Sequence, residues 1–206
     1  MEKWDRDRQP RTGIHTYDVI YCQMKAFLRF KGVEKRVTKT SVGFMVFGII
    51  GDFLIGDLYP KKHRHVKTGL HDIIVSEIDV LDSGLYPLEI KTTRKRVFRK
   101  SQVPQVWVEQ LLTYMCEQNA QQGWLVLLNI FSGQIMTFKL EITQQEIEAQ
   151  KIIILERARQ LKEAVNNNDP SSLEPHPEEY SWCDYRYRCP KKGECQEQAN
   201  KLRKKR

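Results

Sequence analysis

The sequence predicts an α/β protein with one main core and a small cysteine-rich segment behind it. Two observations lead to this fold class. Segments with helical spacing alternate with extended segments broken by turn residues, in the order helices, strands, helix, strands, helix. At 206 residues the chain can bury one good-sized core, and its composition, 40% hydrophobic and 29% charged, excludes a disordered protein.

Two helices are predicted ahead of the first strands. Residues 16–30 favour a helix that Thr16 caps and that carries Cys22 on its length. Residues 41–59 are helical and apolar nearly all round, so we expect this helix to be buried, and its glycines favour tight packing. Asp52 interrupts this stretch, which is shorter than the roughly 20 residues of a membrane span. With a polar N-terminus as well, we expect a cytoplasmic protein, in a prokaryotic or virus-infected cell, without membrane contact.

The central elements follow in order. Residues 66–91 are extended and form a β-hairpin around the turn residues 82–84. Residues 104–118 return to helical spacing, and a second strand pair is expected at 124–131 and 134–142.

A long helix closes the core, because Thr143 and Glu146 form a capping box ahead of a helical segment that runs to about Val165. The next residues have the composition of a linker, and the cysteine-rich segment after them is too short to be held together by burial. The expected divisions are a flexible N-terminus 1–13, the core 14–165, a linker 166–179, the cysteine-rich segment 180–198 and a basic tail 199–206.

Positive charge is concentrated directly after the hairpin. The net charge of +8 and the pI near 9.2 favour a polyanionic partner. Together with Phe98 and Trp107, the basic residues favour a surface for single-stranded DNA, and a solvated loop is the alternative. The residues expected to contact nucleic acid are Arg94, Lys95, Arg96, Arg99 and Lys100.

The hairpin gathers acidic side chains around one lysine. Side chains alternate along a strand, so Glu89 and Lys91 point to the same side. With a three-residue loop at 82–84, Asp79 lies opposite Pro87 and Glu77 lies opposite Glu89. Such a cluster requires water or a cation, and a hard divalent ion takes oxygen ligands of this kind. Phosphodiester hydrolysis suits this arrangement, and a solvent-facing strand with alternating charges is the alternative.

The segments SEID and PLEIK resemble the Asp…Glu-X-Lys signature of the PD-(D/E)XK nuclease superfamily, at Asp79, Glu89 and Lys91. On the following helix, Gln110 and Tyr114 have the Gln-X-X-X-Tyr spacing of RecB-like members and lie on one helical face. The resemblance implies a restriction-endonuclease-like core with a mixed central sheet flanked by helices. It also implies that these five residues are catalytic in a metal-dependent deoxyribonuclease.

The same resemblance implies a catalytic Mg²⁺ or Mn²⁺. RecB-like nucleases often carry a histidine four residues after a glycine on the preceding helix, where this chain has Asp52. Asp72 is a second match to the aspartate position, but its alternation register is opposite to that of Glu89 and it needs a bulge to join the site. The expected metal-binding positions are Asp79, Glu89, Ile90 and Asp52.

Four of the five cysteines suggest a metal or cluster site. Cys183, Cys189 and Cys195 form a C-X5-C-X5-C array, and Cys22 supplies a fourth thiolate from near the other end of the chain. Structural disulfides are not expected in an intracellular protein. Four thiolates fit an iron–sulfur cluster or zinc, and the spacing does not choose between them. Cys116 is expected to be a small buried residue.

One N-terminal and three C-terminal cysteines around a RecB-like core resemble the CRISPR-associated exonucleases of the Cas-four type. This resemblance implies a [4Fe–4S] cluster on Cys22, Cys183, Cys189 and Cys195, although family members more often have two residues between the first two C-terminal cysteines. It implies an exonuclease on single-stranded DNA ends that trims DNA for spacer acquisition with the CRISPR integrase proteins. The alternatives are a RecB-like nuclease of repair, recombination or viral DNA metabolism, and an inactive nuclease fold that binds DNA.

Overall fold

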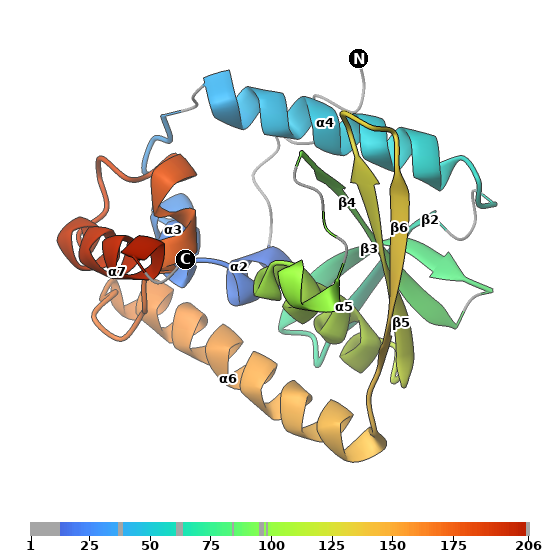
Figure 1. Cartoon of the computed structure of the whole chain (residues 1–206). Helices are drawn as coiled ribbons and strands as arrows, with labels where there is room; N and C mark the ends of the chain where they lie inside the picture. Colours follow the sequence, from blue (N-terminus) through green and yellow to red (C-terminus); the bar gives the residue numbers. More distant parts are fainter. Residues whose placement is uncertain are drawn as a thin grey trace.

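The computed structural model has an α/β fold (Figure 1) and describes residues 13–36, 39–60, 64–83, 85–94, 97 and 99–204. The strands are β1 (Ile14–His15), β2 (Arg64–Leu70), β3 (Ile74–Asp82), β4 (Tyr86–Thr93), β5 (Gln122–Asn129) and β6 (Ile135–Glu141). The α-helices are α2 (Thr16–Ile20), α3 (Gln23–Phe30), α4 (Lys39–Gly56), α5 (Gln105–Glu117), α6 (Gln144–Asn167) and α7 (Lys192–Lys204). The 3-10 helices are η2 (Lys100–Gln102) and η3 (Pro177–Trp182).

The strands form one six-stranded mixed sheet. Its order is β1-β3-β4-β5-β6, and β2 pairs with the other edge of β3. β4 and β5 run parallel and are joined through α5, whereas β3 is antiparallel to both β2 and β4. The expected mixed central sheet flanked by helices is confirmed.

The sheet opens along one edge of β3. On this edge β1 pairs with Ile74 and Val75, and β4 pairs only with residues 80–82. β2 takes the opposite edge. Among the described strands, residues 76–79 therefore have no partner on the β1/β4 side, and this opening is where Asp79 lies.

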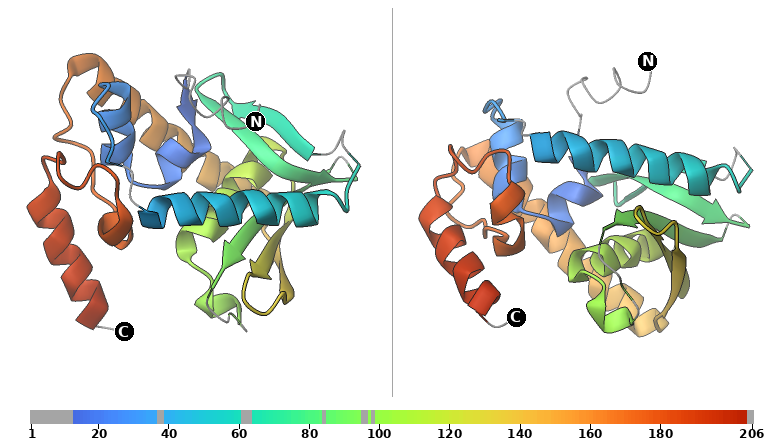
Figure 2. Two further views of the ribbon diagram at one scale, coloured as in Figure 1. Left: turned by 90° about the horizontal axis from the view of Figure 1, so that it is seen from above. Right: turned by 45° about the horizontal axis from the view of Figure 1, so that its top comes forward.

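Helices cover both faces of the sheet (Figure 2). α4 crosses one face, where Ile55 packs in a cluster with apolar side chains of β3, β4 and β5. Its close approach depends on Gly51, because a Cβ at this position would collide with Thr92 of β4. On the other face, Leu111 and Met115 of α5 pack against β5.

The composition of α4 predicts a helix that is buried on all sides, but one side of it is exposed. Phe53 and Leu54 are 62% and 53% exposed, and Ile50 is 42% exposed. Only one side of α4 meets the sheet, and no element of the described chain covers the other. The expectation of a fully buried helix is therefore wrong.

The single helix expected at 16–30 is broken into α2 and α3. Tyr21 and Cys22 between them have extended backbone conformations, and Cys22 is the N-cap of α3. The Cys22 N–H donates to Glu179 Oε1 at 2.9 Å. This long-range bond takes the place of a helical one, so Cys22 lies at a helix boundary and not within a helix.

The expected cap at Thr16 is also wrong. His15 is the N-cap of α2, and its N–H donates to Asp18 Oδ2 at 2.9 Å. The Thr16 hydroxyl instead turns into the core, where it contacts Ser76 and donates to Glu117 Oε1.

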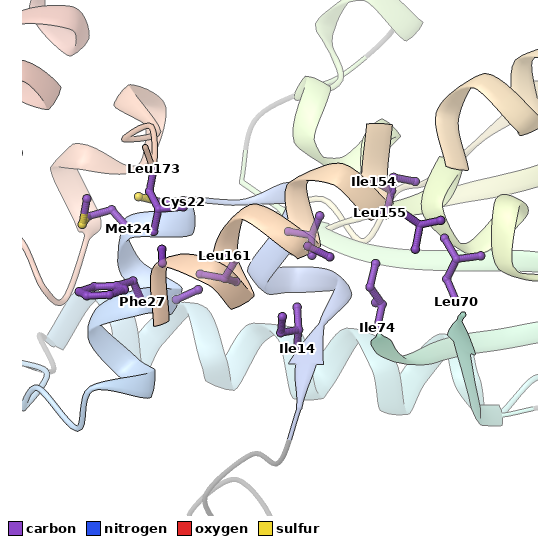
Figure 3. Packing of buried hydrophobic residues seen from close by; sticks show 14 of the residues in the cluster. Ile14, Cys22, Met24, Phe27, Leu70, Ile74, Ile154, Leu155, Leu161 and Leu173 are labelled. Carbon is purple, nitrogen blue, oxygen red and sulfur yellow. The ribbon is translucent and has the colours of Figure 1, made fainter. Parts of the chain in front are cut away.

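The long helix α6 packs along the N-terminal helices and the start of β3. Figure 3 shows Ile154 and Leu155 of α6 near Leu70 and Ile74. The capping box predicted for this helix is present, since the Glu146 N–H donates to Thr143 Oγ1 at 3.2 Å and the Thr143 N–H donates to Glu146 Oε2 at 2.7 Å.

The C-terminal part folds back beside α3, at the end of the molecule away from β5 and β6 (Figure 1). Leu173 and Glu179, both within the segment expected to be a linker, are 0% and 2% exposed. Most of the expected basic tail belongs to α7, and residues 205–206 lie outside the described part. None of the described helices is long and apolar enough to cross a membrane.

Candidate active site

Two carboxylates meet where β3 and β4 separate. The Asp79 carboxylate accepts a hydrogen bond from the Ile90 N–H, with 2.8 Å between Oδ2 and N. Glu89, the preceding residue on β4, is 1% exposed, and its carboxylate forms a direct ion pair with the Lys91 ammonium. The sheet opening thus brings together the three residues of the Asp…Glu-X-Lys pattern.

The hairpin register differs from the expected one. Asp82 pairs with Tyr86, so the loop is 83–85 and not 82–84, and the Leu85 N–H closes the turn on the Asp82 carbonyl at 2.9 Å. The pairings expected from the earlier turn, Asp79 with Pro87 and Glu77 with Glu89, are therefore wrong.

Glu77 does not join the site. Its side chain is 54% exposed, and its Oε1 lies 2.9 Å from His65 Nδ1. The candidate site therefore contains two carboxylates of the hairpin and not three.

Burial makes the Glu89 carboxylate costly to ionise. Its pKa is raised to about 8, first by burial and then by the Asp79 charge, while Lys91 acts in the opposite direction. Both Glu89 oxygens are buried and accept no hydrogen bond of normal geometry from the described residues. An additional cation at this position would stabilise the ionised form.

Lys91 stays positively charged. Burial alone would lower its pKa, but Glu89, Tyr21 and Asp79 act against burial and raise it above the ordinary value. Its side chain is 21% exposed, so the ammonium lies between the buried Glu89 and the solvent side of the opening.

The two α5 residues lie beside the carboxylates. Gln110 Nε2 donates to the Tyr114 hydroxyl at 2.8 Å, as an i,i+4 pair. Tyr114 is 4% exposed and packs against Ile78 of β3. Its pKa is raised well above the ordinary value, first by burial and then by the charges of Glu89 and Asp79.

The other expected metal positions have different outcomes. The Ile90 side chain packs in the cluster around Ile55 of α4. Its N–H faces Asp79, and its carbonyl points to the same side because the N–H and the carbonyl of a strand residue do so. Asp52 is on α4, but its side chain lies outside the described part. Asp72 is exposed in the turn before β3, where its φ is 54°. Asp79 is therefore the aspartate that lies beside Glu89 in the candidate site.

The basic residues expected to contact nucleic acid follow β4 directly. Arg94, Arg99 and Lys100 are exposed. Lys95 and Arg96 lie outside the described residues.

The four predicted cysteines line one cavity. Cys22 lies between α2 and α3, Cys183 follows η3, Cys189 precedes α7 and Cys195 is on α7. The pKa of Cys195 is raised to about 12, first by burial and then by Cys22, Cys189 and Cys183, so the sulfur atoms lie near one another. Within the described chain, no three His, Cys, Asp or Glu side chains are positioned to hold a single metal ion.

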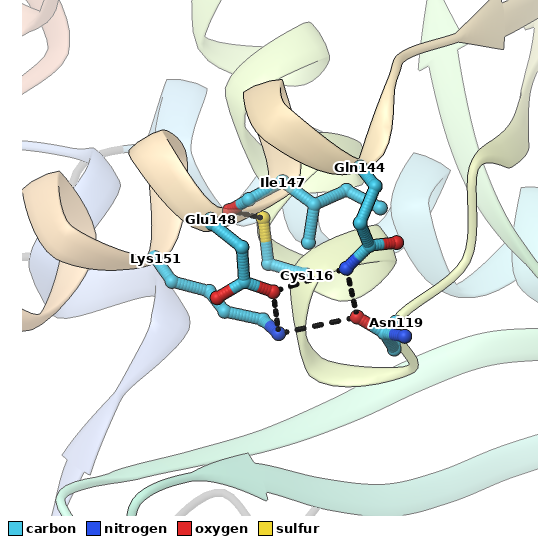
Figure 4. Close-up of polar contacts among 6 residues, drawn as sticks. All are labelled: Cys116, Asn119, Gln144, Ile147, Glu148 and Lys151. Atoms are coloured by element: carbon cyan, nitrogen blue, oxygen red, sulfur yellow. Dashed lines mark hydrogen bonds and ion pairs between the residues drawn. The ribbon is translucent and has the colours of Figure 1, made fainter.

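Cys116 lies elsewhere, at the junction of α5 and α6. Its Sγ is 3.6 Å from the Ile147 carbonyl oxygen, and Lys151 and Glu148 of α6 lie beside Asn119 (Figure 4). Cys116 is buried, as the sequence predicts.

A partly buried chain of polar and ring contacts runs from Cys22 to Tyr21, and the sequence gives no sign of it. Glu179, bonded to the Cys22 N–H, also lies 3.3 Å from Lys25 Nζ. Lys25 donates to the Tyr17 hydroxyl at 2.7 Å, and the Tyr17 ring stacks on Tyr21 with centroids 4.3 Å apart.

Beyond Tyr17, burial raises the pKa of Tyr21 to about 12, while the Lys91 charge lowers it and the Glu89 charge raises it. Glu179 stands in a segment with the composition of a linker, and only the folded chain reveals its partners. His176 is a second residue that the sequence does not mark. It lines the cysteine cavity, and its Nδ1 is buried without a hydrogen bond to the described residues.

No family model and no curated protein matches this sequence. Solved structures match its fold. The alkaline exonuclease LHK-Exo from Laribacter hongkongensis has a TM-score of 0.58 at 10% identity, over 82% of this chain and 96% of that one. The chain has the fold of this exonuclease.

Two further structures agree. The crystal structure of SSO0001 has a TM-score of 0.62 at 18% identity and covers 88% of this chain and 87% of that one. LHK-Exo in complex with dAMP has a TM-score of 0.57 at 14% identity, over 82% of this chain and 96% of that one. At such low identity the likeness concerns the fold, and the activity has to be argued from the side chains of the site.

Proposed function

We propose that the protein is a metal-dependent deoxyribonuclease that degrades single-stranded DNA from its ends. The observation that carries the proposal is the convergence of Asp79, Glu89 and Lys91 at the opening between β3 and β4. A fold shared with an alkaline exonuclease supports it.

The residues fit a hard divalent cation. The buried Glu89 carboxylate is paired with Lys91, but neither of its oxygens accepts a hydrogen bond of normal geometry from the described residues. The Asp79 carboxylate and the Ile90 backbone face the same opening. Mg²⁺ or Mn²⁺ would be held by Asp79, Glu89 and the Ile90 carbonyl, with Asp52 as the further predicted ligand. Mg²⁺ typically keeps several waters and takes one or two carboxylates, so two are sufficient. When bound, the ion supplies Lewis-acid polarisation of a phosphoryl oxygen.

The chain's own residues then have separate tasks. The Lys91 ammonium offsets negative charge that develops on the phosphate and orients the attacking water. Tyr114, held by Gln110, borders the site on the α5 side. Arg94, Arg99 and Lys100 attract the DNA backbone at the end of β4.

The test is a nuclease assay with strands labelled at the 5′ or the 3′ end, with Mg²⁺, Mn²⁺ or EDTA. Wild-type protein should shorten single strands only with metal, whereas Glu89→Ala and Lys91→Ala should lower the rate by at least about 100-fold. Glu77→Gln on the same hairpin is the matched control, because Glu77 is exposed and pairs with His65. Equal cleavage by all four proteins would refute the assignment, and DNA binding without any cleavage would identify a binding module.

We also propose a [4Fe–4S] cluster on Cys22, Cys183, Cys189 and Cys195. The arrangement of these four thiols around one cavity supports it, since soft sulfur ligands bind iron or zinc once deprotonated. The cluster would fasten the C-terminal segment to the start of α3. A colourless protein that contains stoichiometric zinc would overturn this proposal.

The finer biological assignment follows the Cas-four resemblance. We propose that this cytoplasmic nuclease trims DNA before spacer integration, together with CRISPR integrase proteins. An in vitro integration assay with and without the protein tests this role. Unchanged length of the integrated DNA, despite active nuclease, would favour a role in repair, recombination or viral DNA metabolism.

A further inference from the structure

A basic and aromatic surface lies on the rim of the cysteine cavity, and the carboxylate site makes no use of it. Its centre is Tyr187, which is 56% exposed. Three cations approach the ring, with Arg186 at 4.8 Å, Arg36 at 5.1 Å and Lys192 at 5.9 Å from its centroid. Arg186 also donates to the Tyr187 hydroxyl at 2.8 Å. We call these four residues the Tyr187 platform.

Two segments far apart in the sequence build the platform. The Arg36 N–H, in the chain after α3, donates to the Asp184 carbonyl at 3.0 Å. Close by, a guanidinium nitrogen of Arg188 lies 3.7 Å from Glu34 Oε2. These two contacts fasten residues 34–36 to residues 184–188, so the fold itself holds the cations around the ring.

The charge of the platform is only partly balanced. Within the described chain, neither Arg36 nor Lys192 forms an ion pair with a carboxylate, and both are exposed. The Glu34 carboxylate nearby is paired with Arg188. Cations gathered around one ring repel one another, so an anion bound among them would relieve this repulsion. Guanidinium and ammonium groups of this kind bind phosphates.

We propose that the Tyr187 platform is a second binding site for single-stranded DNA, which holds backbone phosphates of the substrate away from the carboxylate site. This inference rests on the proposed function, because the bound strand is the strand to be degraded. Several cations spread around one exposed aromatic side chain suit consecutive phosphates and a stacked base better than a single free phosphate. Arg186 and Lys192 also line the cysteine cavity, so the C-terminal segment would serve to position the platform.

The test is DNA binding without cleavage. A labelled oligothymidylate of about 30 nucleotides is titrated with full-length protein in EDTA over a range of salt concentrations. Arg36→Gln combined with Lys192→Gln should weaken binding about tenfold and reduce the slope of log K against log salt by about 1.4, since each single-strand phosphate contact contributes about 0.7. Tyr187→Ala should weaken binding with little change in slope, because it removes no charge.

The matched control removes the same charge elsewhere. Arg159 and Lys162 are exposed on α6, and the double change Arg159→Gln with Lys162→Gln should leave the affinity and the slope nearly unchanged. Equal losses of DNA affinity in the two double variants would overturn the platform. Unchanged DNA affinity in both double variants would overturn it as well. The nuclease assay separates the two proposals. If the wild type cleaves DNA but the Arg36/Lys192 double variant binds DNA as well as the wild type, the platform alone is refuted. If binding depends on the platform but no DNA is cleaved, the nuclease alone is refuted, and if neither result is seen, both proposals are refuted.

Discussion

The two candidate sites of this protein are built in opposite ways. The carboxylate site takes Asp79, Glu89 and Lys91 from one hairpin, and the bond from the Ile90 N–H to Asp79 joins β3 and β4 across the opening between them. The cysteine site joins Cys22 to three cysteines near the other end of the chain, in a region of short helices and loops.

This difference decides what holds each site in place. The carboxylate site is positioned by strand pairing, which persists without any bound ion. Among the described residues, no strand pairing supports the cysteine site. It is held by apolar packing and by scattered polar contacts, such as those of Glu179 with the Cys22 N–H and Lys25 and of Lys191 Nζ with the Leu173 carbonyl. We therefore expect the cysteine site to be the more easily lost of the two.

The largest expected effect comes from removing a cluster ligand. Cys195→Ser should abolish a broad absorbance near about 400 nm, which is expected of Cys-ligated iron. It should also lower the free energy of unfolding by about 4 kcal/mol, because binding of the metal centre contributes to folding. Thermal unfolding followed by circular dichroism would show a midpoint lowered by about 10 °C. Cys116→Ala is the control, since Cys116 lies in another part of the core and should leave the colour unchanged.

Removing the contacts of Glu179 with α3 and its N-cap ranks second. Glu179→Ala should destabilise the protein by about 3 kcal/mol, because it leaves Lys25 without its carboxylate and the Cys22 N–H without its acceptor. Urea unfolding measures the effect. Glu174→Gln changes an exposed carboxylate of the same segment and should have little effect, so equal destabilisation by both would disprove this role of Glu179.

A pH experiment tests a second carboxyl group with a raised pKa, that of the half-buried Glu117 on α5. Burial raises the pKa of Glu117 to about 7 from an ordinary 4.5, while hydrogen bonds from Ser76 and Thr16 lower it. Because the folded state holds this proton more tightly, its stabilising contribution is complete below about pH 4.5 and is lost as the pH rises through 7.

Glu117→Gln should remove this dependence. From pH 5 to pH 8 in EDTA, the stability of the variant relative to wild type should rise by about 2 kcal/mol. The free energy of unfolding of both proteins is measured in urea at each pH. If it changed with pH by the same amount in both, Glu117 would be ionised in the folded protein throughout this range.

The smallest effect is expected at the edge of the carboxylate site. Gln110→Ala removes the donor to the Tyr114 hydroxyl but leaves both carboxylates in place. The cleavage rate should fall about tenfold, equivalent to about 1.4 kcal/mol, with an unchanged unfolding midpoint. A fall as large as that of Lys91→Ala would place Gln110 among the residues that act directly on the phosphate.

The sequence by itself predicted the fold class and the coarse order of helices, strands, helix, strands and helix. It also named Asp79, Glu89 and Lys91, which the structure brings together at the opening between β3 and β4. The spacing of Asp79, Glu89 and Lys91 was sufficient because alternation along a strand places them on one side whichever residue begins the turn. The exact turn was not readable, since residue preference favours the turn 82–84, Asp-Ser-Gly, whereas the strand pairing of the folded chain places the turn at 83–85.

Only the tertiary structure decided the break between α2 and α3, the exposed side of α4 and the role of Glu179. Each depends on contacts between residues far apart in the chain. Local pattern records the preference of a segment for helix or strand, whereas the partner that takes the Cys22 N–H comes from more than 150 residues away. Such a partner exists only once the two ends of the chain have met.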